Sequence, residues 1–215
     1  MAYVAGRDNY KGTFTWIDRE GNEEPLPIPA GVFGTFDLSP DNGRLAIQVS
    51  GVRDQIYIYD VATGRGQRLT ERGDSRFPIW SPDGKSLVFR WYENGQGGLA
   101  WKKDVTASTP HEMLLSAEVK GNLAAYSFSA DGEELRYTYP SAVADGTEDI
   151  GVLSMKTRGE PSAFIAGDFN EWCPSFSPDG KWVAYCSDRD GQYQIYVRPY
   201  PRTDERFWKI SDDIG

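Results

Sequence analysis

Ser81-Pro82-Asp83-Gly84 is the stretch that decides the fold, because the same turn returns along the chain. The first serines of four such turns are residues 39, 81, 129 and 177, so successive turns start 42, 48 and 48 residues apart. The other three turns are Ser39-Pro40-Asp41-Asn42-Gly43, Ser129-Ala130-Asp131-Gly132 and Ser177-Pro178-Asp179-Gly180. A period of this size indicates a repeated supersecondary unit.

The chemistry of the turn predicts a β-hairpin in each repeat. Proline sets φ near about −65° at the first corner, aspartate tolerates the second corner, and glycine takes the left-handed position. A large apolar residue such as Trp80 precedes each first serine, and a short apolar run such as Leu87-Val88-Phe89 follows each turn. Two apolar runs on either side of a tight turn are typical of paired antiparallel strands.

Two further strand-like runs follow each hairpin, as in Gln55–Tyr59 and Gln67–Thr70. Helical periodicity is absent over any useful length, and four short strands per repeat match the blade of a β-propeller. We therefore predict an all-β chain, a single propeller domain with about five blades of four antiparallel strands. The predicted blades cover residues 1–30, where the blade is partial, and residues 31–72, 73–118, 119–167 and 168–215. The partial blade takes its strands from Ala2–Ala5, Thr13–Asp18 and Glu24–Ile28.

The overall charge argues against two classes of partner. The chain has 215 residues, of which 26% are charged, and its net charge is −9. An acidic chain repels nucleic acid and anionic membrane surfaces. Its apolar runs are far shorter than the roughly 20 residues that cross a bilayer. We expect a soluble protein with no nucleic-acid partner and no membrane insertion.

The stretches Pro78–Lys85 and Pro174–Lys181 resemble the TolB-type β-propeller repeat. The stretches Trp16–Gly21 and Tyr196–Pro201 also resemble propellers found C-terminal to some bacterial serine/threonine kinases. The resemblance covers nearly the whole chain and implies a wheel that usually closes with six blades. The chain is then either a fragment of a six-bladed wheel or a shortened relative. Ala130, in place of proline, is one departure from the pattern.

The resemblance implies a bacterial, non-catalytic module that binds or scaffolds a protein or small ligand, in a parent protein of the periplasm or another place outside the cytoplasm. The alternative is the substrate-gating propeller of a prolyl-oligopeptidase-like hydrolase whose catalytic domain is not in this chain. Unpaired blade edges invite pairing with another chain, so we also expect self-association.

The sequence favours neither catalysis nor a cofactor or metal site. A Ser-His-Asp mechanism would need His111, which is the one histidine, and no Gly-x-Ser-x-Gly elbow accompanies it. We expect His111 to be a surface or loop residue. Asp188-Arg189-Asp190-Gly191 lacks the further oxygen ligands of a calcium loop.

Cys173 and Cys186 lie at the far ends of the last hairpin. With a two-residue loop Cys173 would face Cys186 directly, and with a bulge at the glycine it would face Tyr185 instead. Disulfide geometry is demanding, and we favour two buried free thiols.

Topology predicts where a binding site would lie. In antiparallel blades, the loops between second and third strands emerge on the same side as the connections between blades, and function usually lies on loops held by a rigid scaffold. This loop side carries aromatic and charged residues suited to a peptide, a sugar or a cationic group.

The candidate binding residues are Arg53, Asp54, Trp91, Tyr92, Glu93, Asp145, Glu148, Asp149, Glu171, Trp172, Asp188, Arg189 and Asp190. The segments around Trp91 and Trp172 are predicted as loops, and the other tryptophans as packing between blades. The alternative is that all these are ordinary solvated loops.

Overall fold

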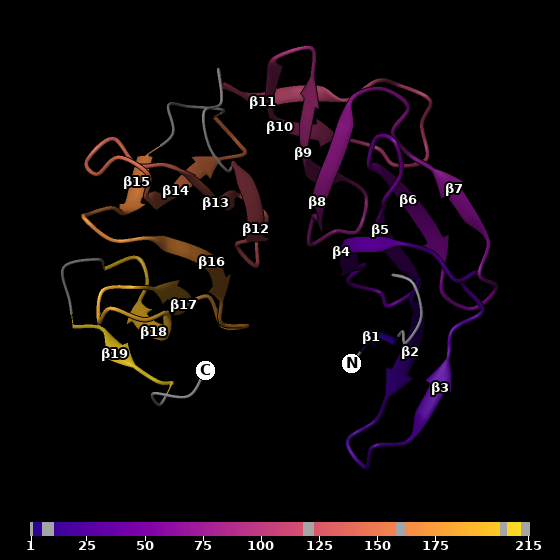
Figure 1. Ribbon diagram of the computed structural model, residues 1–215, viewed down its shortest axis with the longest axis horizontal. Coiled ribbons are helices and arrows are strands. Elements are labelled where there is room, and N and C mark those ends of the chain that lie inside the picture. Colours follow the sequence, from indigo (N-terminus) through magenta and orange to yellow (C-terminus); the bar gives the residue numbers. More distant parts are fainter. Residues whose placement is uncertain (1, 6–10, 118–122, 158–161, 203–205, 212–215) are drawn as a thin grey trace. The chain divides into compact units, whose positions relative to one another are not determined.

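The computed structural model describes residues 2–5, 11–117, 123–157, 162–202 and 206–211, and its strands form five antiparallel sheets (Figure 1). Strand order in each sheet follows the order along the chain. Blade 1 has three strands and blades 2 to 5 have four each, which confirms the predicted all-β propeller blades and the partial first blade. The predicted limits at residues 118/119 and 215 lie outside the described residues.

The strands of the five blades are short, and each pairs with its chain neighbour. Blade 1 contains β1 (Ala2–Ala5), β2 (Thr13–Ile17) and β3 (Glu23–Pro25); blade 2 contains β4 (Phe33–Leu38), β5 (Arg44–Val49), β6 (Gln55–Asp60) and β7 (Gly66–Arg68); blade 3 contains β8 (Asp74–Trp80), β9 (Leu87–Glu93), β10 (Gln96–Lys102) and β11 (Glu112–Ala117); blade 4 contains β12 (Ala124–Phe128), β13 (Glu134–Pro140), β14 (Glu148–Ser154) and β15 (Ser162–Ile165); blade 5 contains β16 (Glu171–Phe176), β17 (Trp182–Ser187), β18 (Gln194–Pro199) and β19 (Trp208–Lys209).

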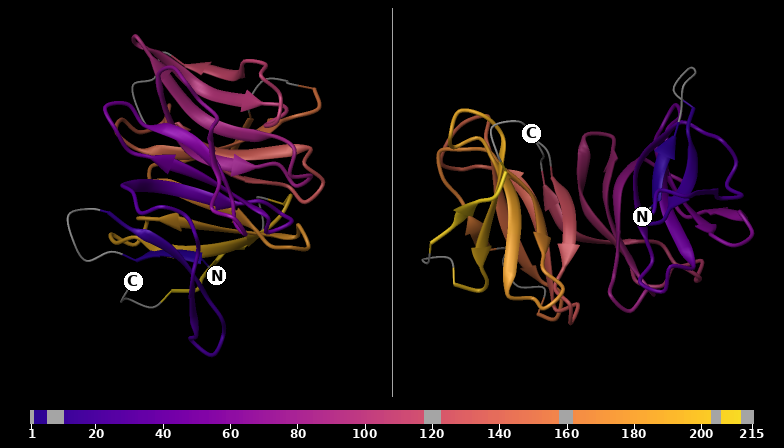
Figure 2. Two further views of the ribbon diagram at one scale, coloured as in Figure 1. Left: turned by 90° about the vertical axis from the view of Figure 1, so that its right-hand side faces the viewer. Right: turned by 90° about the horizontal axis from the view of Figure 1, so that it is seen from below.

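The chain divides into two compact units, Met1–Met113 and Leu114–Gly215, with the division inside β11. Within each unit the blades are twisted sheets, and blades that are consecutive in the chain lie next to one another (Figure 2). Among the described residues, no helix is long and apolar enough to cross a membrane.

The repeated turn is held by its own side chains. In the second turn the Gly84 N–H donates to the Ser81 carbonyl at 2.9 Å, and Gly84 has a left-handed φ of 67°. Asp83 accepts hydrogen bonds from the Ser81 hydroxyl at 2.6 Å and the Lys85 N–H at 3.0 Å. These bonds stabilise the charged form, so the pKa of Asp83 lies below its usual range. In the first turn Asn42, not the expected glycine, takes the left-handed position, with φ 59°.

A bulge interrupts the first strand of each four-stranded blade and decides between the two registers predicted for the cysteines. In blade 5 the pairing shifts between Trp172 and Ser175, and Cys173 has a left-handed φ of 52°. Trp172, not Cys173, therefore faces Cys186. The register in which Cys173 faces Cys186 directly is therefore wrong. Cys173 and Pro174 together lie opposite Tyr185, as in the second predicted register, although the extra residue lies within the strand and not at the turn. Both cysteines are free, and Cys173 is exposed rather than buried.

Apolar side chains between neighbouring blades form the core of each unit. In the first unit, Trp80 packs with Leu87, Phe89 and Ile56, all buried. In the second unit, Ile150 and Val183 pack with buried aromatic residues. Trp182 and Trp208 do not pack between blades as predicted. Their side chains are 39% and 48% exposed, and their ring centroids lie 5.7 Å apart on blade 5.

Arg136 is an unusual core residue of the second unit. It lies seven residues after the first serine of its turn, where the other three blades have Ala46, Val88 and Ala184. Arg136 is fully buried, with its guanidinium carbon 4.5 Å from the ring centroids of Phe176 and Tyr200 and 5.1 Å from that of Phe164. Its Nη2 lies 3.0 Å from Glu134 Oε2. A guanidinium thus fills the space between blades 4 and 5.

Candidate functional site

The structure places several candidate residues on strands. Trp91, Tyr92 and Glu93 end β9, and the pairing of β9 with β10 continues to Glu93 opposite Gln96. The prediction of a loop around Trp91 is therefore wrong. The connection is only Asn94-Gly95, with φ values of 52° and 83°, as in a type I′ hairpin turn. The dipeptide Asn-Gly is the sequence signal that marks this hairpin.

The second segment predicted as a loop also contains a strand. Glu171 and Trp172 begin β16, and Glu148 and Asp149 begin β14. The loop prediction is wrong for Trp172 because strand pairing resumes on the N-terminal side of the bulge, where Trp172 pairs with Cys186. The remaining candidates lie between strands; they are Arg53, Asp54, Asp145, Asp188, Arg189 and Asp190.

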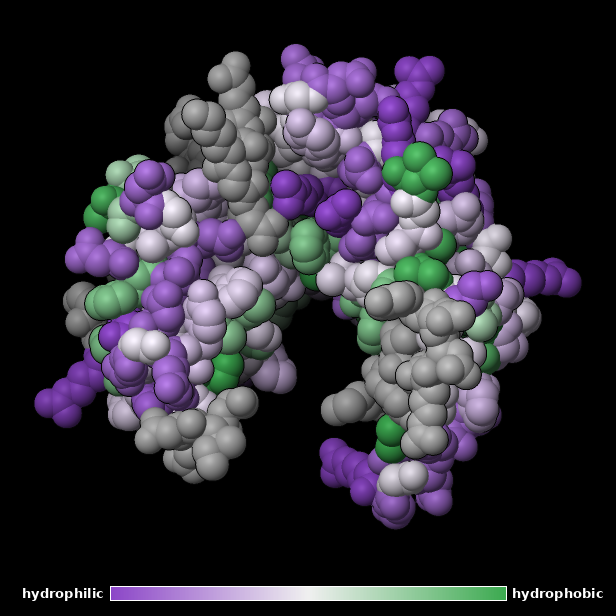
Figure 3. All heavy atoms as spheres, in the orientation of Figure 1, coloured by the Kyte–Doolittle hydropathy of each residue, from purple (hydrophilic) through white to green (hydrophobic). Residues whose placement is uncertain are grey.

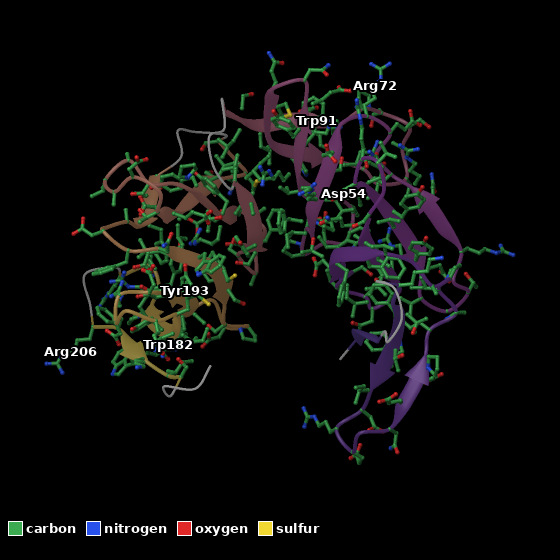
Figure 4. All side chains as sticks on the ribbon, viewed as in Figure 1. Asp54, Arg72, Trp91, Trp182, Tyr193 and Arg206 are labelled. Atoms are coloured by element: carbon green, nitrogen blue, oxygen red, sulfur yellow. The ribbon has the colours of Figure 1, made fainter. Side chains whose placement is uncertain are left out.

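Asp54 joins blade 2 to blade 3 in the first unit (Figure 4). Its Oδ2 accepts a hydrogen bond from Gln48 Nε2 at 2.9 Å and lies 2.9 Å from Arg76 Nε. Its backbone N–H donates to Asp74 Oδ1 at 2.9 Å. The Asp54 side chain is only 13% exposed. These contacts fix the loop before β6 to the start of β8.

Accessible side chains lie beside these Asp54 contacts, which we call the joint between blades 2 and 3. Arg53 Nη1 is 3.4 Å from Glu93 Oε1, and the Arg53 side chain is 54% exposed. Tyr92 is 42% exposed. The Trp91 indole N–H donates to the Arg72 carbonyl at 3.1 Å. This hydrogen bond ties Trp91 to the connection between β7 and β8. The loop side of the first unit therefore presents a tyrosine and an ion pair on a fixed frame.

A similar joint links blades 4 and 5 in the second unit. Asp188 accepts hydrogen bonds from the Asn170 backbone N–H at 2.9 Å and from Asn170 Nδ2 at 2.8 Å. The Glu148 N–H donates to Asn170 Oδ1 at 3.2 Å. Asn170 and Asp74 each lie seven residues before the first serine of a turn. Neither residue is among the candidate binding residues, although this repeated position is a signal that identifies them.

Glu171 and Arg189 form a buried ion pair near that joint. Arg189 Nη2 lies 2.6 Å from Glu171 Oε1, and the two side chains are 17% and 2% exposed. Burial raises the pKa of Glu171, against the opposing effect of Arg189. The Arg189 guanidinium carbon also lies 4.3 Å from the ring centroid of Phe207 and 5.0 Å from that of Tyr196. The Arg189 guanidinium is therefore occupied by its ion pair with Glu171 and its contacts with aromatic rings.

The remaining candidates of the second unit are more accessible. Trp172 packs against Tyr193 with ring centroids 5.1 Å apart, and Tyr193 is 53% exposed. Asp190 Oδ2 lies 3.7 Å from Lys209 Nζ. Asp149 is buried and accepts a hydrogen bond from the Gly167 N–H at 3.2 Å, whereas Asp145 lies exposed in a turn.

A groove that the sequence does not predict runs along β7, and we call it the β7 groove. Two adjoining hollows of about 320 and 440 Å³ share Gln67, Leu69, Val105 and Thr106. They lie between β7 of blade 2 and the β10–β11 loop of blade 3. No local pattern predicts this groove, because its walls come from different repeats.

His111 lies at one end of the β7 groove. It is half-buried, with its ring 5.5 Å from Phe89 and 5.2 Å from Trp91 between centroids. Burial and then the charge of Lys102 lower the pKa of His111 below its ordinary value. The ring therefore stays neutral near pH 7. Within the described ranges, no group of three or more His, Cys, Asp or Glu side chains is placed to hold a metal ion.

Comparisons with known proteins agree on the fold. Two solved structures are similar: one assigned as TolB from Agrobacterium tumefaciens (21% identity, TM-score 0.72, covering 89% of this chain and 66% of that chain) and TolB from Acinetobacter baumannii (22%, 0.71, 96% and 49%). The fold is therefore that of the TolB-type β-propeller repeat, as the sequence predicts. No family model matches the chain.

One curated relative is named an uncharacterized peptidase, YuxL, from Bacillus subtilis. It is 30% identical over 213 residues, which covers 91% of this chain and 30% of the relative. The chain thus spans less than a third of that relative's length.

Proposed function

We propose that this chain is a non-catalytic binding module, a TolB-like propeller that presents its loop side to a protein or peptide. The observation that carries the proposal is the set of hydrogen bonds that cross between blades. Asp54 and Asn170 each fix a loop to the neighbouring blade, while Tyr92 and Tyr193 beside them are exposed. Binding to a fixed surface loses less conformational entropy than binding to mobile loops.

The chemistry of the loop side suits a polypeptide ligand. Exposed tyrosines supply a large contact area with a hydroxyl at the tip. The Arg53–Glu93 pair offers both signs of charge next to Tyr92. An aromatic anchor with polar groups around it is the usual composition of an energetically important contact in protein interfaces.

A second function is favoured by the relative named as a peptidase. This chain matches 30% of that protein's length, and in this second proposal it corresponds to a propeller that admits substrate to a separate hydrolase domain. The full reading frame of the parent gene distinguishes the two functions. A hydrolase domain encoded beside the propeller supports the second function, and a kinase domain upstream supports the first.

Affinity selection tests the proposed function directly. The chain is incubated with a mixed peptide library, bound peptides are isolated with the protein, and both bound and free peptides are identified by mass spectrometry. We expect a subset of peptides to be retained intact and no peptide to be cleaved. The double variant Tyr92→Ser/Tyr193→Ser should lose the peptides of that subset that bind the loop side.

The matched control is Met113→Ser/Ile210→Ser, which removes exposed apolar side chains on or near outer strands. It should retain the same peptides as the wild-type chain. Retention of nothing by the wild-type chain, or equal losses in both double variants, contradicts the proposal. Cleavage of the library contradicts the non-catalytic assignment.

We also propose that copies of the chain associate through blade edges. Supporting this, β7 and β19 are short strands at the ends of their sheets, where backbone groups are open to pairing. The exposed Trp182 and Trp208 on blade 5 add apolar surface. Light scattering at high protein concentration should give a mass above that of the monomer, and a strictly monomeric mass contradicts association.

A further inference from the structure

The β7 groove is cationic in an acidic protein. The whole chain has 23 Lys and Arg residues against 32 Asp and Glu residues. Among the side chains that line the groove this balance is reversed, with five basic and two acidic residues and a net charge of +3. The basic residues are Arg44, Arg65, Arg68, Arg72 and Lys102, and the acidic residues are Asp60 and Glu71.

Two of these arginines are available to a ligand. Arg65 and Arg72 are exposed (Arg72 in Figure 4), and their guanidinium groups form no salt bridge or hydrogen bond among the residues described. The Asp60 carboxylate attracts Arg65 electrostatically without forming a salt bridge with it. The hydrogen bonds of this carboxylate come instead from the Thr63 N–H at 2.8 Å and the Thr63 hydroxyl at 2.6 Å. Arg68 differs, since its Nε and Nη2 donate to backbone carbonyls at 2.6 and 3.0 Å.

Lys102 adds a buried positive charge to the opposite wall. The residue is 6% exposed, and its Nζ donates to the Ala107 carbonyl at 2.6 Å and to the Thr109 carbonyl. It forms no salt bridge within the described part of the chain. Burial lowers the pKa of Lys102, against the longer-range charge of Asp104. Because carbonyl groups carry no net charge, an anionic ligand in the groove would gain from this ammonium group.

The floor of the groove is apolar. Ile58, Leu69, Phe89 and Val105 line it together with the neutral ring of His111. The two hollows have the volume of sites that hold organic ligands, and they lie side by side along the outer strand of blade 2. On the face of the first unit drawn in Figure 3, hydrophilic and hydrophobic side chains are interspersed. This combination suits an extended ligand that has both carboxylates and apolar side chains.

We propose that the β7 groove binds an acidic, partly apolar peptide segment of a partner, with Arg65 and Arg72 meeting its carboxylates and the floor at Leu69 and Val105 holding an apolar side chain. The proposal rests on the proposed binding function, but it uses a different surface from the loop side. An extended peptide can also run alongside the open edge of β7, as peptides do on other edge strands. The match of charge should speed association and make it sensitive to salt.

A labelled peptide tests the groove. The probe is a fluorescein-labelled octapeptide of alternating Glu and Leu, and its binding is followed by fluorescence anisotropy. We expect saturable binding to the wild-type chain that weakens as sodium chloride is raised. The double variant Arg65→Glu/Arg72→Glu should bind about tenfold or more weakly, because attraction is replaced by repulsion at two positions.

Lys11→Glu/Arg19→Glu is the matched control, since both residues are exposed in blade 1 or next to it and the net charge changes equally. It should change the affinity by less than threefold. Three results would overturn the inference: no binding, equal losses in the two double variants, or equal binding of an alternating Lys and Leu peptide. Displacement of the probe by millimolar acetate or phosphate would also overturn it, because the groove would then recognise a small anion and not a peptide.

The loop-side variant Tyr92→Ser/Tyr193→Ser separates this inference from the proposed function. It should bind the acidic probe as the wild-type chain does. If the groove variants leave peptide retention unchanged while the tyrosine variant abolishes it, the groove inference fails and the proposed binding function stands.

Discussion

Replacing Arg136 tests how the joint between blades 4 and 5 is stabilised. The side chain is fully buried among Phe164, Phe176 and Tyr200. Arg136→Ala leaves a cavity there and removes the cation–π contacts. Loss of a large buried side chain costs about 2–5 kcal/mol, and desolvated cation–π contacts contribute about 2 kcal/mol. We expect Arg136→Ala to lower the free energy of unfolding by about 4 kcal/mol.

Arg136→Met separates packing from charge. The partner Glu134 is 35% exposed, so solvent weakens the ion pair. Within the described residues, Arg136 Nε and Nη1 have no hydrogen-bond partner, and buried unpaired donors are destabilising. Methionine fills most of the volume and keeps contacts between sulfur and the rings. We therefore expect Arg136→Met to cost only about 1 kcal/mol.

The assay is urea denaturation of the wild-type chain and both variants, followed by far-ultraviolet circular dichroism and tryptophan fluorescence. The variant Glu134→Gln should have a small effect, of about 1 kcal/mol or less. Equal losses for Arg136→Ala and Arg136→Met would contradict stabilisation by packing, since they would mean that the charge and not the volume of Arg136 stabilises the contact between blades 4 and 5.

Three further predictions concern other groups. Asp54→Ala should lower the free energy of unfolding by about 2 kcal/mol, because it leaves the partners of a largely buried carboxylate unpaired. An unchanged urea midpoint would contradict the role of Asp54 in holding blades 2 and 3 together. The lowered pKa of His111 means that the folded chain binds this proton less tightly than the unfolded chain. Stability should therefore fall as the pH drops below about 6.5, and His111→Phe should remove that dependence between pH 7.5 and 5.5. Partial desolvation of the sulfur atoms raises the pKa of both Cys173 and Cys186 above its ordinary value, so a thiol reagent should count two thiols, each reacting slowly at pH 7 and faster at alkaline pH; fewer than two thiols in the denatured, unreduced protein would indicate a disulfide.

The repeat could be predicted from the sequence because its determinants are local. Each Ser-Pro-Asp-Gly turn contains its own hydrogen-bonding groups, as Ser81 and Asp83 show, and its position labels the strands around it. The dipeptide Asn94-Gly95 also predicts its hairpin locally, and the loop prediction for the aromatic residues before it disregards this signal. The sequence leaves two registers open for Cys173, because the position of a bulge depends on pairing with the next strand.

The candidate site was less predictable because its contacts are not local. Asp54 and Arg76 come from different blades, and no local pattern indicates that they pair. Charge and aromaticity selected Glu171 and Arg189, which form a buried pair. The same criteria overlooked Arg72, whose significance depends on Lys102 across the β7 groove.

Affinity selection of a mixed peptide library by the native chain is the decisive test of a non-catalytic binding module. We predict that a defined set of peptides is recovered intact with the wild-type protein, and that none is cleaved. Recovery of no peptide, or the appearance of cleavage products that depend on the chain, would contradict a non-catalytic binding module.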